Sequence, residues 1–352
     1  IITIVPTSAN VKSYATIVSE KAVLRRLIKT TEEIANTCYA GKEPLENILA
    51  DTEKSIFDLL QNKGGQEFVP IKQVAINVLE KIEDAYKNQG TVTGIPSGFI
   101  DLDYKLSGFQ PSDFILIAAR PSMGKTALAL NIMTNVCEQG GKVLFVSEET
   151  PKNKVYDRLI SSIGEIDYKL LREGRLGEKG ANKVIKLCES LKDFQLDIFD
   201  RRVSVAEMKA RAQLTKAKFN GLDLIVVDHI QLTRGDGRYR DRVHEVGEIV
   251  HGLKDLATRL DVPVLALSQL SRASETREDK RPLLPDLRET GDIEQDADIV
   301  LGLYRPAYYT RDKTDRCVEL GTLKAKDSEL KVIPLVWYGE TQKFKSATTR
   351  TE

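Results

Sequence analysis

A short segment of the chain combines residue types that together bind phosphate. Residues 119–126 read Ala-Arg-Pro-Ser-Met-Gly-Lys-Thr and directly follow the apolar run 114–118. A buried strand, a tight loop and a helix opening with Gly-Lys-Thr would present backbone N–H groups at a positive helix end, which attracts anions. The ammonium of Lys125 would reach the β- and γ-phosphates of a nucleotide, and the hydroxyl of Thr126 would hold Mg²⁺. The segment predicts a phosphate-binding loop, although Ala119 replaces the usual first glycine.

The loop and the first turn of the following helix are the expected contacts of a bound ATP. These residues are Arg120, Pro121, Ser122, Met123, Gly124, Lys125, Thr126 and Ala127. The alternative is an ordinary strand-to-helix turn with a solvated lysine.

Three further apolar runs end in polar residues that could act on the same phosphates. Ligands of parallel sheets bind at the carboxyl ends of the strands, so we expect these side chains to meet at one edge. They are Glu148 and Glu149 after residues 143–147, Asp228 after 224–227, and Gln269 after 264–268.

Two of these carboxylates suit metal-assisted hydrolysis. Asp228 would be a fixed carboxylate beside Mg²⁺ and Thr126, with a helix N-cap as the alternative. Glu149 can orient and deprotonate an attacking water, and the adjacent Glu148 competes for that role.

The remaining polar groups at this edge are less specific. Gln269 can hydrogen-bond the γ-phosphate or the water, although a turn-forming amide is an equal alternative. We interpret His229, which follows Asp228, as a hydrogen-bonded structural residue rather than a base.

Composition narrows the class of protein. The 352 residues carry 52 basic and 52 acidic side chains, so nucleic acid could bind only through local basic loops. The four cysteines form no CxxC pair, which favours a reducing compartment over a zinc or disulfide framework. We see no signal peptide or membrane span, and we expect a cytoplasmic protein.

From Gly94 onward, strand-length apolar runs alternate with helical or loop stretches. This alternation predicts an α/β fold with a mainly parallel sheet and helices on both faces. The last two runs lack an intervening helix and are expected to form an antiparallel hairpin at an edge. The runs are 114–118, 143–147, 196–199, 222–227, 263–267, 298–303, 317–323 and 332–338.

The part before Gly94 is helical in pattern. Apolar spacing predicts a helix over 11–40 that stops at Gly41, and a second helix from Pro44 that completes a hairpin. Residues 71–87 form an amphipathic segment whose apolar stripe could pack on its own domain or on a neighbouring subunit. The predicted domains are a helical hairpin at 1–62, a linker with an amphipathic helix at 63–92, and an α/β nucleotide-binding domain at 93–352.

Several segments resemble the replicative hexameric DNA helicases of the DnaB family. The strongest match is 263–300, in particular Ala266–Arg272 and Asp292–Val300. The resemblance covers essentially the whole chain, and from it we expect the chain to lack the globular first part of the family's N-terminal domain. Further matching segments are 10–28, 93–99, 118–126 and 225–232.

The resemblance implies a RecA-like ATPase core, a homohexameric ring and ATP bound between subunits. It assigns Lys125 and Thr126 to phosphates and Mg²⁺, and Asp228 to the metal site. It makes Glu149 the catalytic carboxylate and Gln269 the γ-phosphate sensor. It also makes residues 71–87 a linker helix that docks on the adjacent subunit. The implied partners are single-stranded DNA, a primase and a helicase loader, in the cytoplasm of a bacterium, for a bacterial or phage protein.

The chain departs from the family at the arginine finger that reaches across the subunit interface. Counting back from the last predicted strand places the finger pair on Lys324 and Lys326, so the finger position holds lysine. Lysine supplies charge without the planar fork of arginine, so either Lys326 acts less rigidly or another residue such as Arg305 replaces it. His229 also stands where the family commonly has Tyr.

Two loops are candidates for contacting DNA. Residues 234–242 are basic and contain glycine, but two aspartates make a solvated turn a real alternative. Residues 285–291 follow the Gln269 strand. By resemblance this second loop grips the single-strand backbone, and Arg158 also lies at a channel position. The predicted DNA contacts are Arg158, Arg288, Glu289 and Gly291.

These observations predict an ATP-dependent replicative helicase that translocates on single-stranded DNA. One alternative is a RecA-like recombinase or signalling ATPase that does not unwind DNA. The other is a non-enzymatic module whose degenerate nucleotide site serves only assembly, and the intact Lys125, Glu149 and Asp228 argue against it.

Overall fold

The computed structural model describes residues 11–41, 92–235, 237, 241–287, 291–312, 314–326 and 329–347, with isolated positions between 48 and 83. The chain divides into two compact units, Ile1–Lys87 and Asn88–Glu352. Among the described residues, no helix combines the length and apolar character needed to cross a membrane.

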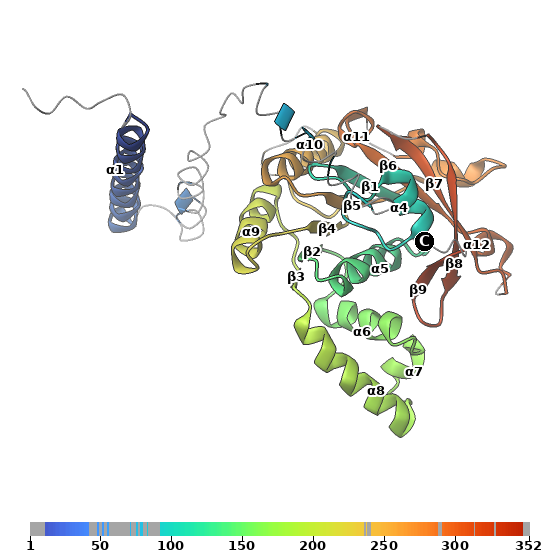
Figure 1. Cartoon of the computed structure of the whole chain (residues 1–352). Coiled ribbons are helices and arrows are strands. Elements are labelled where there is room, and N and C mark those ends of the chain that lie inside the picture. The colour runs from blue at the N-terminus through green and yellow to red at the C-terminus, as the bar shows by residue number, and fades with distance from the viewer. Residues whose placement is uncertain are drawn as a thin grey trace, which may run out of the picture. The chain divides into compact units, whose positions relative to one another are not determined.

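The described element of the first unit is helix α1, Val11–Ala40 (Figure 1). It has the bounds that the sequence predicts and ends at Gly41, whose positive φ of 57° is typical of a glycine after a helix. The second hairpin helix and the docking segment 71–87 lie mostly outside the described residues and stay predictions. Large apolar side chains of α1 are exposed, namely Val18, Leu24, Leu27, Ile28 and Tyr39.

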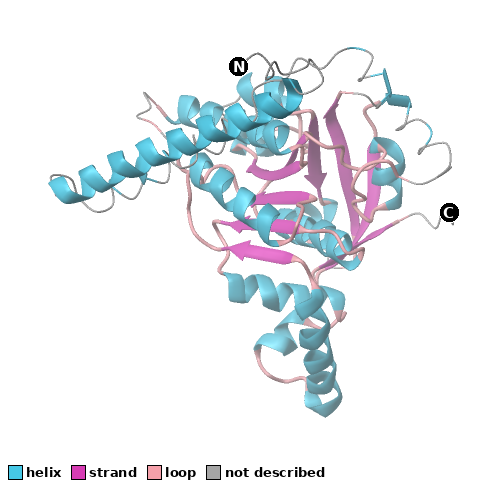
Figure 2. Ribbon diagram, turned by 60° about the vertical axis from the view of Figure 1, so that its left-hand side comes forward, coloured by secondary structure: helices cyan, strands magenta, loops and turns pink. Residues whose placement is uncertain are grey.

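The second unit is built on one nine-stranded sheet in the order β3-β2-β4-β5-β1-β6-β7-β8-β9 (Figures 1 and 2). The first six strands in this order are parallel, and β7, β8 and β9 are antiparallel. The strands are β1 Phe114–Ala119, β2 Val143–Ser147, β3 Leu196–Phe199, β4 Leu224–Asp228, β5 Val264–Gln269, β6 Ile299–Tyr304, β7 Cys317–Ala325, β8 Val332–Tyr338 and β9 Lys343–Ser346.

All eight predicted strands are present, and the mainly parallel sheet is confirmed. The antiparallel end differs from the prediction because it holds three strands rather than two, and among the described residues β9 is its last strand. The four residues of β9 are too few for a clear alternation, so sequence pattern alone does not reveal them.

The helices of this unit cover both faces of the sheet (Figure 2). Figure 1 shows α6, α7 and α8 extending from the sheet as an arm. The helices are α4 Ile100–Leu106, α5 Lys125–Glu138, α6 Lys152–Ile163, α7 Tyr168–Arg172, α8 Gly177–Ser190, α9 Val205–Lys218, α10 Arg242–Leu260, α11 Gly291–Asp296 and α12 Pro306–Thr310, with short 3₁₀ helices at Leu191–Asp193, Arg272–Thr276 and Leu284–Asp286.

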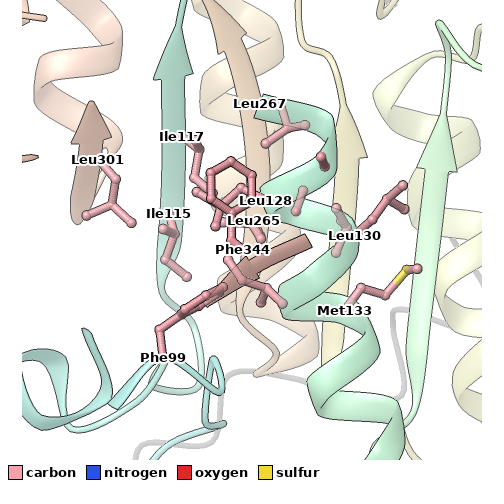
Figure 3. Packing of buried hydrophobic residues seen from close by; sticks show 14 of the residues in the cluster. Phe99, Ile115, Ile117, Leu128, Leu130, Met133, Leu265, Leu267, Leu301 and Phe344 are labelled. Carbon is pink, nitrogen blue, oxygen red and sulfur yellow. The ribbon is translucent and has the colours of Figure 1, made fainter. Parts of the chain in front are cut away.

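Strand β1 separates two hydrophobic cores because side chains alternate along a strand. Ile115 and Ile117 pack with α4, α5 and α6 in one core (Figure 3). Phe114 and Leu116 pack with α9, α10 and α11 in the other. The strand is therefore buried on both sides, which fixes the loop that follows it at the carboxyl edge of the sheet.

Candidate nucleotide site

Four neighbouring strands bring the predicted polar residues to one edge of the sheet. Strands β2, β4, β5 and β1 are adjacent in that order. Ser147 pairs with Asp228, and Ala119 pairs with Gln269, so these strands end at nearly the same level. The phosphate-loop candidate, Glu149, Asp228 and Gln269 thus share the edge at which ligands of parallel sheets bind.

The loop between β1 and α5 has the backbone that a phosphate cradle requires. Gly124 is the N-cap of α5 and has a φ of +102°, a backbone conformation that residues with a Cβ rarely adopt. A Cβ at this position would also lie 3.0 Å from Cζ of Phe344. The N-terminal turn of α5 therefore keeps its N–H groups open toward the cavity beside it.

A cavity of about 480 Å³ lies against this loop. Of the predicted nucleotide contacts, all but Met123 line it, and the side chain of Met123 packs in the core. The lining residues are Ala119, Arg120, Pro121, Ser122, Gly124, Lys125, Thr126, Ala127, Glu149, Arg158, Gln269, Arg305, Trp337, Gly339 and Gln342.

Thr126 and Asp228 form the innermost polar contact of the site. The Thr126 hydroxyl donates a 2.8 Å hydrogen bond to Oδ2 of Asp228, which is fully buried. Burial raises the pKa of Asp228, against the effect of the nearby Lys125 ammonium. Burial likewise lowers the pKa of Lys125, against the pull of Asp228 and Glu149. The phosphates of a nucleotide would relieve the burial cost of this ammonium.

The two adjacent glutamates after β2 face different surroundings. The buried Glu148 accepts hydrogen bonds from the Val203 amide at 3.1 Å and from the Thr233 hydroxyl at 2.6 Å. Burial raises its pKa to about 7. The Glu149 side chain is 57% exposed and lines the cavity. This placement favours Glu149 over Glu148 as the group that can reach a water beside the phosphates.

His229 also faces the site, although sequence pattern favours a hydrogen-bonded structural role. It follows Asp228 through a cis peptide bond. Its Nδ1 lies 3.2 Å from Oε2 of Glu149 and 3.9 Å from Oδ1 of Asp228, yet this buried nitrogen has no hydrogen-bond partner among the described residues. Burial, assisted by Lys125 and Arg202, lowers the pKa of His229 to about 3, so the imidazole is neutral near pH 7.

Arg120 and Gln269 are held by neighbours on the β5 side of the cavity. The Arg120 guanidinium binds Glu275 at 2.7 Å and the Leu270 carbonyl at 2.8 Å. Its charge is thus paired within the loop region rather than free for phosphate. The backbone N–H of Gln269 donates to Oε1 of Gln231 at 3.2 Å, and Gln269 is exposed at the cavity.

Arg158, which the resemblance places at a DNA-channel position, lies in the wall of this cavity. The reason is that α6, which carries Arg158, packs against α5 beside the phosphate loop. Its buried Nε has no hydrogen-bond partner in the part of the chain that the structure describes, and its charge lowers the pKa of Asp228. The structure thus associates Arg158 with the nucleotide cavity, and its contact with DNA stays a prediction.

The other predicted DNA contacts are described only in part. Arg288 and Glu289 lie outside the described residues, and Gly291 is the first residue of α11. An added Cβ on Gly291 would meet no described atom within 4 Å, so its described surroundings are open. In the other candidate loop, Arg242 binds Glu245 at 2.6 Å and the Gln231 carbonyl at 2.7 Å, which commits it to the fold.

Lys324 and Lys326 lie away from this cavity. The ammonium of Lys324 donates to the carbonyls of Glu294 and Gln295 at the end of α11. Lys326 contacts Asp298 at 3.2 Å, just before β6. Arg305, the alternative finger, instead follows the carboxyl end of β6 and lines its own chain's cavity.

Sequence reasoning missed the wall formed by the turn between β8 and β9. Trp337, Gly339 and Gln342 line the cavity from this side. Asn131 of α5 fixes the turn, because it accepts from the Phe344 amide at 2.6 Å and donates to the Gln342 carbonyl at 3.2 Å. A turn directly after a strand is the available signal, but nothing local indicates that it folds back onto α5.

Comparisons with known proteins agree with this geometry. Residues 94–346 match the DnaB-like helicase C-terminal domain. The chain is 41% identical to the replicative DNA helicase DnaC of Bacillus subtilis over 97% of this chain and 76% of that protein. The identity and both coverages are the same for the replicative DNA helicase DnaB of Geobacillus stearothermophilus.

Two solved structures share the fold. One is an isolated ATPase domain that is 36% identical with a TM-score of 0.76, over 79% of this chain and 99% of that domain. A DnaB-like replicative helicase, solved in a study of its interactions with primase, is 32% identical with a TM-score of 0.78. That match covers 97% of this chain and 80% of the other.

Proposed function

The chain belongs to the family of DnaB-like replicative DNA helicases, and from that premise we propose that it works as a homohexameric ring on single-stranded DNA. Membership makes the chain an ATP-hydrolysing replicative helicase with a RecA-like core. The finer proposal is that ATP with Mg²⁺ binds at each interface between subunits, and that hydrolysis drives translocation and unwinding of the duplex. We also propose that it acts in the cytoplasm, with a primase and a helicase loader as partners.

The hydrogen bond between Thr126 and Asp228 is the observation that carries the nucleotide assignment. A hydroxyl beside a fully buried carboxylate at the end of a phosphate loop suits Mg²⁺, which prefers oxygen ligands and keeps several waters. The residues present therefore fit the metal, with Thr126 to hold it and Asp228 to fix its surroundings. Bound Mg²⁺ would neutralise charge on the phosphate oxygens.

The remaining cis residues divide the work of hydrolysis. Lys125 and the N-terminal turn of α5 hold the phosphates. Glu149 orients a water and accepts its proton, since this carboxylate reaches the cavity while both oxygens of Glu148 are bonded elsewhere. Gln269 senses the γ-phosphate from the neighbouring strand end.

The placement of Lys326 supports a role in trans. Its contact Asp298 also accepts a 2.8 Å hydrogen bond from the amide of Phe114, the first residue of β1. The phosphate loop follows the last residue of β1, roughly 17 Å away at 3.3 Å per residue. Lys326 therefore points to the edge opposite its own cavity, where a neighbouring subunit's nucleotide could lie. Lys324 is directed to the same edge.

A short chain of contacts supports coupling between Gln269 and the proposed DNA loop 285–291. Two residues after Gln269, the amide of Ser271 donates to the Asp286 carbonyl at 3.0 Å. The buried Asp286 side chain in turn accepts two hydrogen bonds from Arg277, at 2.9 and 2.7 Å. A movement of Gln269 with the nucleotide state would thus reach the base of the loop. The proposed DNA contacts beyond that base are Arg288, Glu289 and Gly291.

The alternative of a recombinase or signalling ATPase without unwinding is not favoured. The replicative helicase relatives align over nearly the whole chain, including the segment before the ATPase domain.

Measurement of ATPase and unwinding on forked DNA tests the proposal directly. Thr126→Ala should lower turnover by about 10²-fold or more, because it removes the hydroxyl expected at the metal. Thr126→Ser keeps that hydroxyl and should retain most activity. A chain whose ATPase ignores single-stranded DNA, and whose Thr126→Ala variant still unwinds forks, would contradict it.

A further inference from the structure

We propose that His229, Glu149 and Asp228 form a second divalent-cation site, which takes a d-block ion such as Zn²⁺ and is separate from the Mg²⁺ that accompanies the nucleotide. Each of the three side chains offers one ligand atom within 4.8 Å of the other two. We take the ligand atoms to be Nδ1 of His229, a carboxylate oxygen of Glu149 and Oδ1 of Asp228. The inference goes beyond the proposed helicase function, which requires only the nucleotide and its Mg²⁺.

The distances fit a shared ion. Nδ1 of His229 lies 3.2 Å from Oε2 of Glu149 and 3.9 Å from Oδ1 of Asp228. Two ligands each about 2.0–2.2 Å from one metal lie about 2.8–4.4 Å apart, depending on the angle between them. The exposed Glu149 side chain can adjust, whereas Asp228 and His229 are held by burial.

Unsatisfied atoms point to a ligand at this place. Oδ1 of Asp228 and Nδ1 of His229 are both buried and have no hydrogen-bond partner within the described ranges. Asp228 is fully buried, and the His229 side chain is only 9% exposed. Buried polar atoms in folded proteins nearly always have partners, so two orphans facing one another need an explanation. A cation would satisfy both atoms at once.

The donor set selects the kind of ion. Mg²⁺ prefers oxygen ligands, whereas a neutral imidazole favours Zn²⁺, Co²⁺ and related ions. Asp228 can serve both metals, because Oδ2 faces Thr126 and Oδ1 faces His229. His229 is the residue that creates the site, and a tyrosine at this position would remove its nitrogen ligand.

Nearby positive charges determine when the site fills. Lys125 and Arg158 act on Asp228, and Arg202 acts on His229, so a cation is opposed when the phosphate loop is empty. Phosphates bound to Lys125 would offset this repulsion. Once bound, the ion would hold the Glu149 carboxylate and withdraw it from water, which would inhibit hydrolysis.

Calorimetric titration of Zn²⁺ into the full chain saturated with ADP and Mg²⁺ tests the site, with ADP and Mg²⁺ alone as the blank. We expect one ion per chain, with affinity at least tenfold lower in His229→Tyr and in Glu149→Gln. If His229→Tyr unfolds the protein because His229 is buried, Glu149→Gln still tests the site, since Glu149 is exposed. His251→Asn is the matched control, because this exposed imidazole lies 3.5 Å from Asp296 outside the site, and its affinity should equal that of the wild type.

Visible absorption of bound Co²⁺ identifies the ligands independently. Bands from nitrogen and oxygen ligation that disappear in His229→Tyr support the site. A thiolate charge-transfer band would place the ion on a cysteine and overturn the proposal, as would equal Zn²⁺ affinity in wild type and both site variants. Inhibition of ATPase by Zn²⁺ rests on Glu149 being the base. Tight Zn²⁺ binding at His229 without inhibition of ATPase would therefore contradict the role of Glu149 as the base, but it would not contradict the metal site.

Discussion

Glu148 and Thr233, 85 positions apart in the sequence, are joined by a 2.6 Å hydrogen bond between two buried side chains. The other carboxylate oxygen of Glu148 accepts from the Val203 amide, and its own amide donates to the Asp228 carbonyl at 2.8 Å. Glu148 thus ties the ends of β2 and β4 to the segment before α9. This anchor fixes the backbone from which the neighbouring Glu149 reaches the cavity.

The stability of the protein should depend on pH through Glu148. Burial raises its pKa to about 7, above the ordinary value of 4.5. Because the unfolded chain loses this proton first, the folded state loses stability as pH rises from about 4.5 to about 7, by about 3 kcal/mol at most. Glu148→Gln removes the ionisation and keeps an acceptor for Val203. We expect its thermal midpoint to exceed that of the wild type by several degrees at pH 8 and by little at pH 5.

Thermal melts of both proteins at the two pH values measure this difference. Glu189→Gln, which changes an exposed residue of α8, is the control and should shift neither midpoint. An equal gain for Glu148→Gln at pH 5 and pH 8 would show that ionisation is not the cause.

Substitution of each adjacent glutamate in turn should distinguish the catalytic residue from the residue that anchors the backbone. Glu149→Gln removes the proposed base and should reduce ATP turnover by about 10²–10⁴-fold while nucleotide binding remains. Glu148→Gln should keep turnover within a few-fold, since the amide can preserve the anchoring hydrogen bonds. Steady-state ATPase and fluorescent-nucleotide binding distinguish the two. The reverse pattern of losses would transfer the role of base to Glu148.

The edge of the sheet that carries the site could be predicted because its information is local. Each of the residues Glu149, Asp228 and Gln269 follows an apolar run of strand length, which indicates where that strand ends. The carboxyl ends of parallel strands lie at the same edge of the sheet. The order that makes β2, β4, β5 and β1 neighbours is not local, and it is this order that brings their ends close together along the shared edge. The phosphate loop, by contrast, needs only one strand and one helix.

The parts that escaped prediction depend on contacts between distant segments. Arg158 enters the cavity because α6 packs on α5, and Trp337 and Gln342 enter because Asn131 holds the turn after β8. Neither packing arrangement leaves a periodic signal in its own segment. The choice between Glu148 and Glu149 was open for the same reason, since it depends on Val203 and Thr233.

Lys326 should act on a neighbour's nucleotide, which mixed rings can test. Lys125→Ala disables the phosphate loop of its own subunit, and Lys326→Ala should disable the interface it offers to the next. Each variant alone should have little ATPase activity. After subunit exchange, about a quarter of the interfaces in a random equal mixture would combine an intact Lys125 with an intact Lys326 from the neighbour. ATPase activity should therefore reappear on mixing.

Two further variants sharpen the test of Lys326. Lys326→Arg should retain or increase activity, since arginine provides the planar fork that lysine lacks. Lys331→Ala removes an exposed lysine that contacts Glu329 nearby and serves as the control. A mixture that stays as inactive as its components would assign the effect of Lys326→Ala to its own subunit, through the lost contact with Asp298.

The loop at 285–291 should bind the backbone of single-stranded DNA through Arg288. Arg288→Ala removes one expected phosphate contact, so affinity should fall for every sequence and the salt dependence should weaken by about one charge. Fluorescence anisotropy with oligonucleotides of different sequence, measured over a salt series with a non-hydrolysable nucleotide, gives both quantities. Arg172→Ala, on the exposed surface of α7, is the control and should change neither. An unchanged salt slope for Arg288→Ala would remove this residue from the DNA path, and a loss confined to one sequence would indicate base recognition instead.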